Sequence, residues 1–151
     1  MRPEEVSRLE RRKINIDKGY IFIPYGKTNA ARRKIPLSQR AATIIKSRLE
    51  REESDFVFPG MRGVDKSIKH VVKLNNAHHG ALKRSGVAPF RLYDLRHTFA
   101  TRAAEAGVDL VTLAALLGHS RVQMVMRYAH PTEEHQFNAM KKIEACRAAL
   151  G

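Results

Sequence analysis

Residues 93–130 read YDLRHTFATRAAEAGVDLVTLAALLGHSRVQMVMRYAH, and this stretch decides the fold. Apolar residues recur in it at helical spacing, and two glycines interrupt the pattern, so it predicts successive short helices. The predicted helices span Tyr93–Ala106, which Gly107 ends; Leu110–Leu117, which Gly118 ends; and a segment capped by Ser120 that carries Val122, Val125 and Tyr128. This half of the chain is therefore expected to be helical throughout.

Outward from this stretch, the N-terminal part of the chain predicts a small sheet. Ile14 and Ile16 alternate with polar residues, and Tyr20–Ile23 and Arg33–Leu37 have the composition of further strands. The remaining predicted helices span Pro3–Lys13, Ser38–Glu53, Val64–Lys83 and Thr132–Leu150. Residues 1–151 are thus expected to form one domain of the α+β class, mainly α-helical with one small three-stranded antiparallel sheet near the N-terminus.

Composition limits the class of protein. A chain of 151 residues with 43% hydrophobic residues can bury a core, which excludes a disordered or collagen-like chain. It lacks an apolar run of roughly 20 residues that could span a bilayer, so no membrane partner is expected. The start of the sequence lacks the apolar segment of a secretory signal, and Cys146 is the single cysteine. These features predict a cytoplasmic protein without an intrachain disulfide or a cysteine-based zinc site.

Positive charge predicts the partner. Lys and Arg total 28 against 15 Asp and Glu, which gives a formal net charge of +13. A charge of this size favours a polyanion such as DNA or RNA, although a solubilising surface or structural binding of the ribosomal type would also fit. Between Gly26 and Arg40 the chain holds basic residues and no acidic one. Arg32, Arg33 and Lys34 in this segment fit a solvated strand edge, but their place near Lys27 favours contact with phosphate.

Common phosphate and metal motifs are missing from the sequence. It contains neither Gly-x-x-x-x-Gly-Lys-[Ser/Thr] nor Gly-x-Gly-x-x-Gly, and its carboxylates are too scattered for a two-metal nuclease. His78 and His79 are adjacent and would point to different sides of a helix, so they are poor joint ligands. We therefore expect no metal and no cofactor, and expect side chains to supply the positive charge for any phosphate chemistry.

Five segments, in this order, resemble the catalytic domain of the tyrosine recombinases, the phage integrase family. They are Arg2-Pro3-Glu4-Glu5, Gly26-Lys27-Thr28, Tyr93-Asp94-Leu95-Arg96-His97, Leu117-Gly118-His119-Ser120 and Met126-Arg127-Tyr128-Ala129-His130. The resemblance covers essentially all 151 residues and implies the integrase-like fold of DNA breaking–rejoining enzymes. It also implies site-specific DNA integration or excision by a bacterial or phage-encoded, nucleoid-associated protein.

The resemblance implies a catalytic role for each matching residue. Arg2 and Arg96 would hold the scissile phosphate of duplex DNA, and His119 would hydrogen-bond it. Tyr128 would attack the phosphorus to give a 3′-phosphotyrosyl link, while Lys27 would protonate the departing 5′ oxygen. That 5′-hydroxyl would then attack a partner strand. The chemistry suits the residue types, because guanidinium groups bind two phosphate oxygens at once and such preorganised donors are worth about 3–4 kcal/mol each.

Several residues keep a second interpretation. Tyr93 stands where the family most often has histidine, and a phenol can donate a hydrogen bond but is a poor base near neutrality, so we expect it to keep a positional role. Glu5 either orients Arg2 or complements the start of its helix. His97 fits a structural hydrogen-bonding role. Taken alone, Arg96 and Tyr128 would also fit a buried arginine and a half-buried aromatic residue in a helical core.

Two other activities stay open at this point. A type IB topoisomerase would use the same chemistry to relax supercoils, and a degenerate relative would bind DNA without cleaving it; Tyr93 is the one feature that favours the latter. The resemblance further implies that this chain is the catalytic half alone, without the N-terminal core-binding domain. The C-terminal helix, Thr132–Leu150, resembles the segment that packs on a neighbouring protomer, so other protomers, as a tetramer on DNA, are expected partners.

Overall fold

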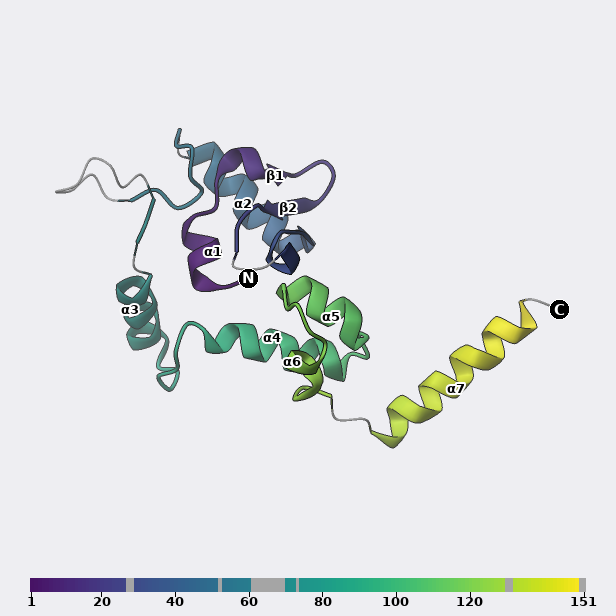
Figure 1. Cartoon of the computed structure of the whole chain (residues 1–151). Helices are drawn as coiled ribbons and strands as arrows, with labels where there is room; N and C mark the ends of the chain where they lie inside the picture. Colours follow the sequence, from purple (N-terminus) through teal and green to yellow (C-terminus); the bar gives the residue numbers. More distant parts are fainter. Residues whose placement is uncertain (27–28, 52, 61–69, 73, 130–131, 150–151) are drawn as a thin grey trace.

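The computed structural model describes residues 1–26, 29–51, 53–60, 70–72, 74–129 and 132–149. Figure 1 shows the sheet with α1 and α2 beside it, the group of helices α3 to α6 below them, and the last helix, α7, which extends away from the rest. The expected mainly helical α+β fold is confirmed. Its helices are α1 (Pro3–Ser7), α2 (Gln39–Arg51), α3 (Asn75–Ser85), α4 (Asp94–Glu105), α5 (Leu110–Leu117), α6 (Gln123–Met126) and α7 (Glu133–Ala148).

The sheet is antiparallel in the order β1 (Ile14–Asn15), β2 (Tyr20–Ile23) and β3 (Arg33–Pro36). Along β2, Ile21 and Ile23 are buried, whereas Tyr20 and Phe22 are only half-buried. This alternation is expected of a strand that has one face covered by the rest of the protein. Ile21 pairs with Ile35, and Ile23 pairs with Arg33. Because directly paired residues share a face, this register places the Arg33 side chain on the covered side of the sheet.

The predicted helix Pro3–Lys13 is wrong in its second half. The helix α1 ends at Ser7, and a separate 3₁₀ turn, η1, spans Arg11–Lys13. Between them the chain pairs with a distant segment: Glu10 forms a β-bridge with Phe56, and the Val57 amide donates to the Leu9 carbonyl at 2.9 Å. This pairing buries Leu9 and replaces the helical hydrogen bonds that a continuous helix would have made.

The predicted helix Val64–Lys83 also differs from the structure. Residues 61–69 and 73 lie outside the described residues, and His70 forms a β-bridge with Pro59. The helix α3 begins at Asn75 and ends before Gly86, whose φ of 67° provides the left-handed turn. In contrast, the observed bounds of α4 and α5 agree with the predicted ones to within a residue or two.

Two apolar clusters form the core. The first joins the sheet and α2 to the segments that follow α1 and α2, and its buried residues are Leu9, Ile21, Ile23, Ile45 and Val57. The second joins α4, α5 and α6 through Ala100, Leu113, Ala114, Leu117 and Val125. Since α5 packs against β3, the two clusters lie side by side, and the candidate site forms where they meet.

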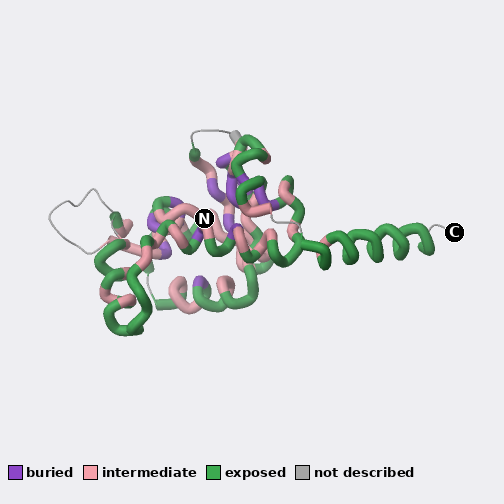
Figure 2. Tube along the Cα trace, turned by 90° about the horizontal axis from the view of Figure 1, so that it is seen from below, coloured by how far each residue is buried: buried purple, intermediate pink, exposed green. Residues whose placement is uncertain are grey.

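The last helix, α7, covers neither cluster. Apart from the half-buried His135, its described side chains are exposed, and it extends away from the rest of the molecule (Figure 2). Its start is fixed by the Thr132 side chain, which accepts a hydrogen bond from the His135 amide, and by the His135 ring, whose Nε2 lies 2.9 Å from the Glu105 carbonyl. Within the described ranges, no helix has the length and apolar character needed to cross a bilayer.

Candidate active site

His119 is positioned by the end of α5. The Asp109 side chain caps the start of this helix by accepting a hydrogen bond from the Thr112 amide at 2.8 Å. At the other end Gly118 turns with φ 70°, and the His119 amide donates back to the Ala114 carbonyl at 2.9 Å. This left-handed cap fixes the direction in which His119 leaves the helix.

Gly118 is required for a second reason, which is the close approach of Arg33. A Cβ atom at position 118 would lie 2.6 Å from Arg33 Nη1 and 2.9 Å from its Cζ. The glycine of the Leu-Gly-His-Ser segment therefore provides both the positive φ and the space for a guanidinium group. Through this contact the loop after α5 is linked to β3.

Arg33 does not have the role expected of it. It was predicted to contact DNA phosphate, but its residue is only 8% exposed and its guanidinium is fully engaged inside the protein. Nη1 and Nη2 donate to the two Glu5 carboxylate oxygens at 3.1 and 2.9 Å, Nη1 also donates to the Ala31 carbonyl, and Nε donates to the Leu116 carbonyl, both at 2.9 Å. The register of β3 places the side chain on the covered face, whereas Arg32 and Lys34 on either side are exposed.

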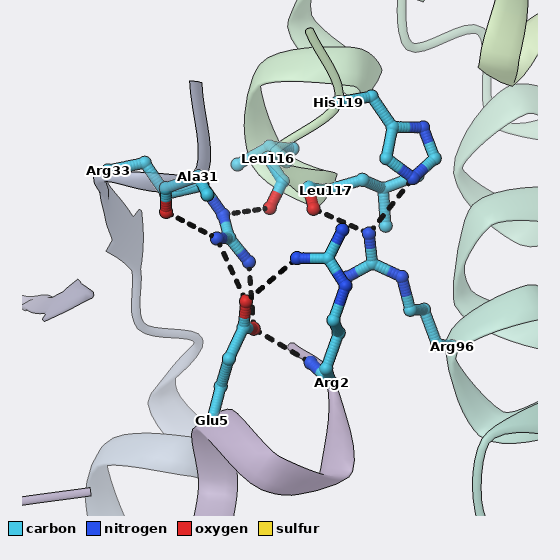
Figure 3. Close-up of polar contacts among 8 residues, drawn as sticks. All are labelled: Arg2, Glu5, Ala31, Arg33, Arg96, Leu116, Leu117 and His119. Carbon is cyan, nitrogen blue, oxygen red and sulfur yellow. Dashed lines mark hydrogen bonds and ion pairs between the residues drawn. The ribbon is translucent and has the colours of Figure 1, made fainter. Parts of the chain in front are cut away.

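Glu5 has both of the roles that the sequence left open. Its carboxylate accepts a hydrogen bond from the Arg2 backbone amide at 2.7 Å, which caps α1, and one from the Arg2 guanidinium at 3.1 Å, which orients that side chain. Burial opposes ionisation of Glu5, but the hydrogen bond from Arg33 and the Arg2 amide outweigh it, so the pKa of the carboxyl is lowered. The ion pairs Arg33–Glu5–Arg2 thus form a continuous brace (Figure 3).

Arg96 and His119 contact each other directly. Arg96 is 6% exposed, and its Nη2 donates to the Leu117 carbonyl and lies 3.1 Å from His119 Nε2. A guanidinium can only donate, so Nε2 is the acceptor and the neutral ring carries its proton on Nδ1. Burial, followed by the charges of Arg96 and Arg2, lowers the pKa of His119 to about 4. At neutral pH His119 is therefore an uncharged hydrogen-bond donor.

Two buried donors of this pair have no hydrogen-bond partner among the described residues: Arg96 Nη1 and His119 Nδ1. In Figure 3 the Arg2 side chain, from the start of α1, points toward the Arg96 guanidinium. Burial lowers the pKa of Arg96, and so does the nearby like charge of Arg2. Unpartnered donors beside two guanidinium groups are chemically suited to bind an anion such as phosphate.

Tyr128 lies in a neighbouring cluster. Its hydroxyl oxygen is 2.6 Å from His97 Nδ1 and 2.8 Å from Arg127 Nη2, and within the described part of the chain it makes no hydrogen bond to Arg96 or His119. Tyr128 follows the short helix α6, which is anchored by the fully buried Val125, and its ring packs on the second apolar cluster. The structure therefore brings Arg2, Arg96 and His119 together and holds Tyr128 beside them through the residue that follows Arg96.

The remaining predicted residues lie at the edge of this region or outside it. Tyr93 is 41% exposed immediately before α4, and its ring meets the His97 ring edge-on with centroids 5.3 Å apart. Lys27 lies outside the described residues. Over the ranges that the structure covers, no three His, Cys, Asp or Glu side chains gather in a way that would hold a metal ion.

The lowered pKa of His119 predicts a pH-dependent contribution to stability. In the unfolded chain its pKa returns to 6.5, so between pH 6.5 and about 4 the unfolded state binds a proton that the folded state does not. The free energy of unfolding should therefore fall as the pH is lowered through this window. Urea denaturation measures the free energy of unfolding of wild type and of His119→Gln. The difference between the two proteins should change between pH 7.5 and pH 5, a range in which Glu5 stays ionised. A difference that stayed constant over this range would contradict a lowered pKa for His119.

Comparisons with known proteins agree with this arrangement. A family model described as "Phage integrase family" matches residues 1–135. The tyrosine recombinase XerA of Thermococcus kodakarensis is 30% identical over 159 aligned residues, which cover 100% of this chain and 54% of XerA. The chain spans about half or less of the length of the curated relatives it matches.

Solved structures share the fold. The Tn1549 transposon integrase in complex with circular intermediate DNA superposes with a TM-score of 0.73 at 19% identity, over 95% of this chain and 56% of that one. The catalytic domain of bacteriophage HP1 integrase superposes with a TM-score of 0.60 at 21% identity, over 93% and 73%. The fold described above is thus that of integrase and recombinase catalytic domains.

Proposed function

This chain belongs to the phage integrase family, and on that premise we propose that residues 1–151 form the catalytic domain of a site-specific tyrosine recombinase that breaks and rejoins strands of duplex DNA. The observation that carries the proposal is the anion site in which Arg2 and Arg96 point toward one another beside the neutral His119. The likeness to the catalytic domain of HP1 integrase supports the domain assignment.

In the proposed reaction a DNA phosphate occupies the anion site. Arg2 and Arg96 bind its non-bridging oxygens, and His119 Nδ1–H donates a further hydrogen bond. The Tyr128 oxygen attacks phosphorus, the bond from phosphorus to the 5′ oxygen breaks, and Lys27 protonates that oxygen as it leaves. The product is a 3′-phosphotyrosyl link, and attack by the 5′-hydroxyl of a partner strand reverses the step. Tyr93, at the rim, keeps a positioning role.

We place the duplex against the face that presents Arg2 and His119. Arg32, just before β3, and Lys34, on β3, are exposed and are proposed to contact the DNA backbone, whereas Arg33 is excluded from this role by its burial. Such contacts are independent of base sequence and weaken with added salt, because binding releases counterions from the phosphates.

The proposed assembly is a tetramer on DNA, joined through α7 to a second copy. Phe137, Met140 and Ile143 are 68%, 55% and 52% exposed on this helix, and their spacing of three residues places them along one side. A single exposed helix of this length is marginal in water, so an apolar partner surface would stabilise it. Phe99 on α4 and Met124 on α6 are also exposed and offer such a surface on another copy.

This assembly predicts that charges on the apolar side of α7 will disrupt oligomers. The double variant Phe137→Glu/Met140→Glu should bind duplex DNA as a monomer where wild type binds as a higher oligomer, since a carboxylate at each position opposes burial. Analytical ultracentrifugation of the protein–DNA complex measures this. The double variant Asn138→Glu/Ala145→Glu places the same charge on the other side of the helix and should assemble normally; disruption by both variants would argue against a specific interface.

Covalent capture tests the function itself. The chain is incubated with a pool of nicked duplexes of randomised sequence, in which cleavage releases a short fragment and traps the enzyme. Adducts are separated on a denaturing gel, and the attached DNA is sequenced. An adduct linked through a tyrosine to a 3′-phosphate supports the proposal. Binding to the pool without any adduct would favour the catalytically inert DNA-binding relative instead.

A further inference from the structure

A cluster beside the anion site joins the Tyr128 hydroxyl to two side chains that the proposed reaction has not used. His97 Nδ1 lies 2.6 Å from the Tyr128 oxygen, and Arg127 Nη2 lies 2.8 Å from the same oxygen. Arg127 Nη2 also lies 3.4 Å from His97 Nδ1. The three groups thus form a closed triangle around the atom that would attack phosphorus.

The chemistry of the three groups fixes the direction of each hydrogen bond. Arg127 has only donors, so both of the atoms that it faces, the Tyr128 oxygen and His97 Nδ1, are acceptors. His97 Nδ1 is therefore unprotonated, and the neutral ring carries its proton on Nε2. The Tyr128 hydroxyl must then donate its proton toward His97 Nδ1, because it is the one group of this pair with a hydrogen to give.

His97 is well supported in this position. It lies in the first turn of α4, next to the buried Arg96, and its ring is half-buried against those of Tyr93 and Tyr128. Asp94 lies one turn earlier on α4, where its carboxylate pairs with Arg91 at 2.9 Å, and it is close enough to act on a positive charge that forms on the His97 ring. The carboxylate of Asp94 would stabilise a positive charge on the His97 ring.

Two other groups in this region are less suited to accept a proton from the Tyr128 hydroxyl. His119 Nε2 already accepts a hydrogen bond from Arg96, and the pKa of His119 is lowered to about 4. The Tyr93 phenol contacts the His97 ring rather than the Tyr128 oxygen, and a phenol is a poor base near neutrality. Among the described residues, His97 is the base in hydrogen-bond contact with the Tyr128 hydroxyl.

We infer that His97 is a catalytic residue that accepts the Tyr128 proton, an inference that rests on the proposed function. As the Tyr128 oxygen bonds to phosphorus, its O–H bond breaks and the proton moves to His97 Nδ1, which leaves an imidazolium. The bond to the 5′ oxygen breaks with its electron pair, and the proposed acid Lys27 supplies the proton for that oxygen. When a 5′-hydroxyl attacks the phosphotyrosyl link, its proton passes to the now neutral Lys27, the bond from phosphorus to the Tyr128 oxygen breaks, and the imidazolium returns its proton to that oxygen.

The first test needs no DNA. Long-range ¹H–¹⁵N spectra of the ¹⁵N-labelled chain report which ring nitrogen of each histidine carries the proton. We expect neutral His97 to carry it on Nε2, and the Nδ1 resonance to shift in Tyr128→Phe, which lacks the donated hydrogen bond. A His97 ring with its proton on Nδ1 would overturn the inference.

The second test measures the rate of adduct formation on the duplex that covalent capture selects. His97→Ala should slow this rate about 10²–10⁴-fold, and added imidazole should restore it in proportion to its concentration, because a free base can replace the missing ring. His97→Gln, which fills the space but cannot accept the proton, should be equally slow. His79→Ala removes an exposed histidine of α3 and should react like wild type.

The outcomes separate this inference from the proposed function. If wild type forms the Tyr128 adduct and both His97 variants match its rate, the inference fails and the function stands. If His97→Ala is slow, folded by circular dichroism and unaffected by imidazole, His97 is structural. If wild type forms no adduct, the function fails and the inference with it.

Discussion

Replacing Tyr128 with phenylalanine should abolish the covalent protein–DNA adduct and leave DNA affinity almost unchanged. The substitution removes one oxygen, the proposed nucleophile, and keeps the ring that packs on the second apolar cluster. Loss of a catalytic nucleophile costs about 10⁴-fold or more, so no adduct should be visible on a denaturing gel. Fluorescence anisotropy with the same duplex should give an affinity within a few-fold of wild type, because in the proposed site Arg2, Arg96 and His119, and not the Tyr128 hydroxyl, bind the phosphate.

Two other tyrosines make this experiment decisive. Tyr20 lies on the sheet, where its ring stacks with Lys34, and Tyr20→Phe should form the adduct normally. Tyr93 lies in the Leu-Arg-His segment itself, and Tyr93→Phe should retain activity if that residue only positions its neighbours. An adduct that persisted in Tyr128→Phe and vanished in Tyr93→Phe would assign the nucleophile to Tyr93 instead.

Replacing Arg33 with methionine should destabilise the protein strongly. The substitution leaves the buried Glu5 carboxylate without its main partner, and removal of one member of a buried ion pair costs about 3–5 kcal/mol. It also leaves the Leu116 and Ala31 carbonyls without a donor that they have now. Urea denaturation measures the change in the free energy of unfolding.

The neighbouring residue provides a matched control. Arg32 carries the same charge but is exposed, so Arg32→Met should change the free energy of unfolding by no more than about 0.5 kcal/mol. The double variant Arg33→Met/Glu5→Met should recover part of the loss, because it removes the unpaired buried charge as well. Equal stability of Arg33→Met and Arg32→Met would show that the brace contributes little.

Local sequence patterns predicted the helices best. The bounds of α4 and α5 follow from apolar periodicity and from Gly107 and Gly118, which act within a few residues. The end of α1 was not predictable in this way, because it depends on pairing between Glu10 and Phe56 across more than forty residues. Long-range pairing of this kind overrides helix propensity, and the sequence pattern of neither segment indicates it.

The candidate site was likewise predictable only in part. The family resemblance placed Arg2, Arg96 and His119 in one phosphate site, and the structure brings them together. The prediction that Arg33 contacts phosphate was wrong, although the sequence contained one indication of its burial. Residues two apart on a strand share a face, so Arg33 lies on the same face as Ile35 and not on that of the exposed Lys34. The contact between His97 and Tyr128 had no such signal, because it depends on the direction in which the chain leaves α6.

The brace formed by Arg33, Glu5 and Arg2 also keeps the candidate site assembled. Arg2 belongs to the half of the molecule built on the sheet, whereas Arg96 and His119 belong to the helical half, and Arg33 holds the two in contact through Glu5 and the end of α5. A small separation of the halves would pull the guanidinium groups apart while each half kept its own interior. Under the proposed function, the capacity to cut DNA would then disappear well before the protein unfolds, so that a partly opened molecule would leave DNA strands intact.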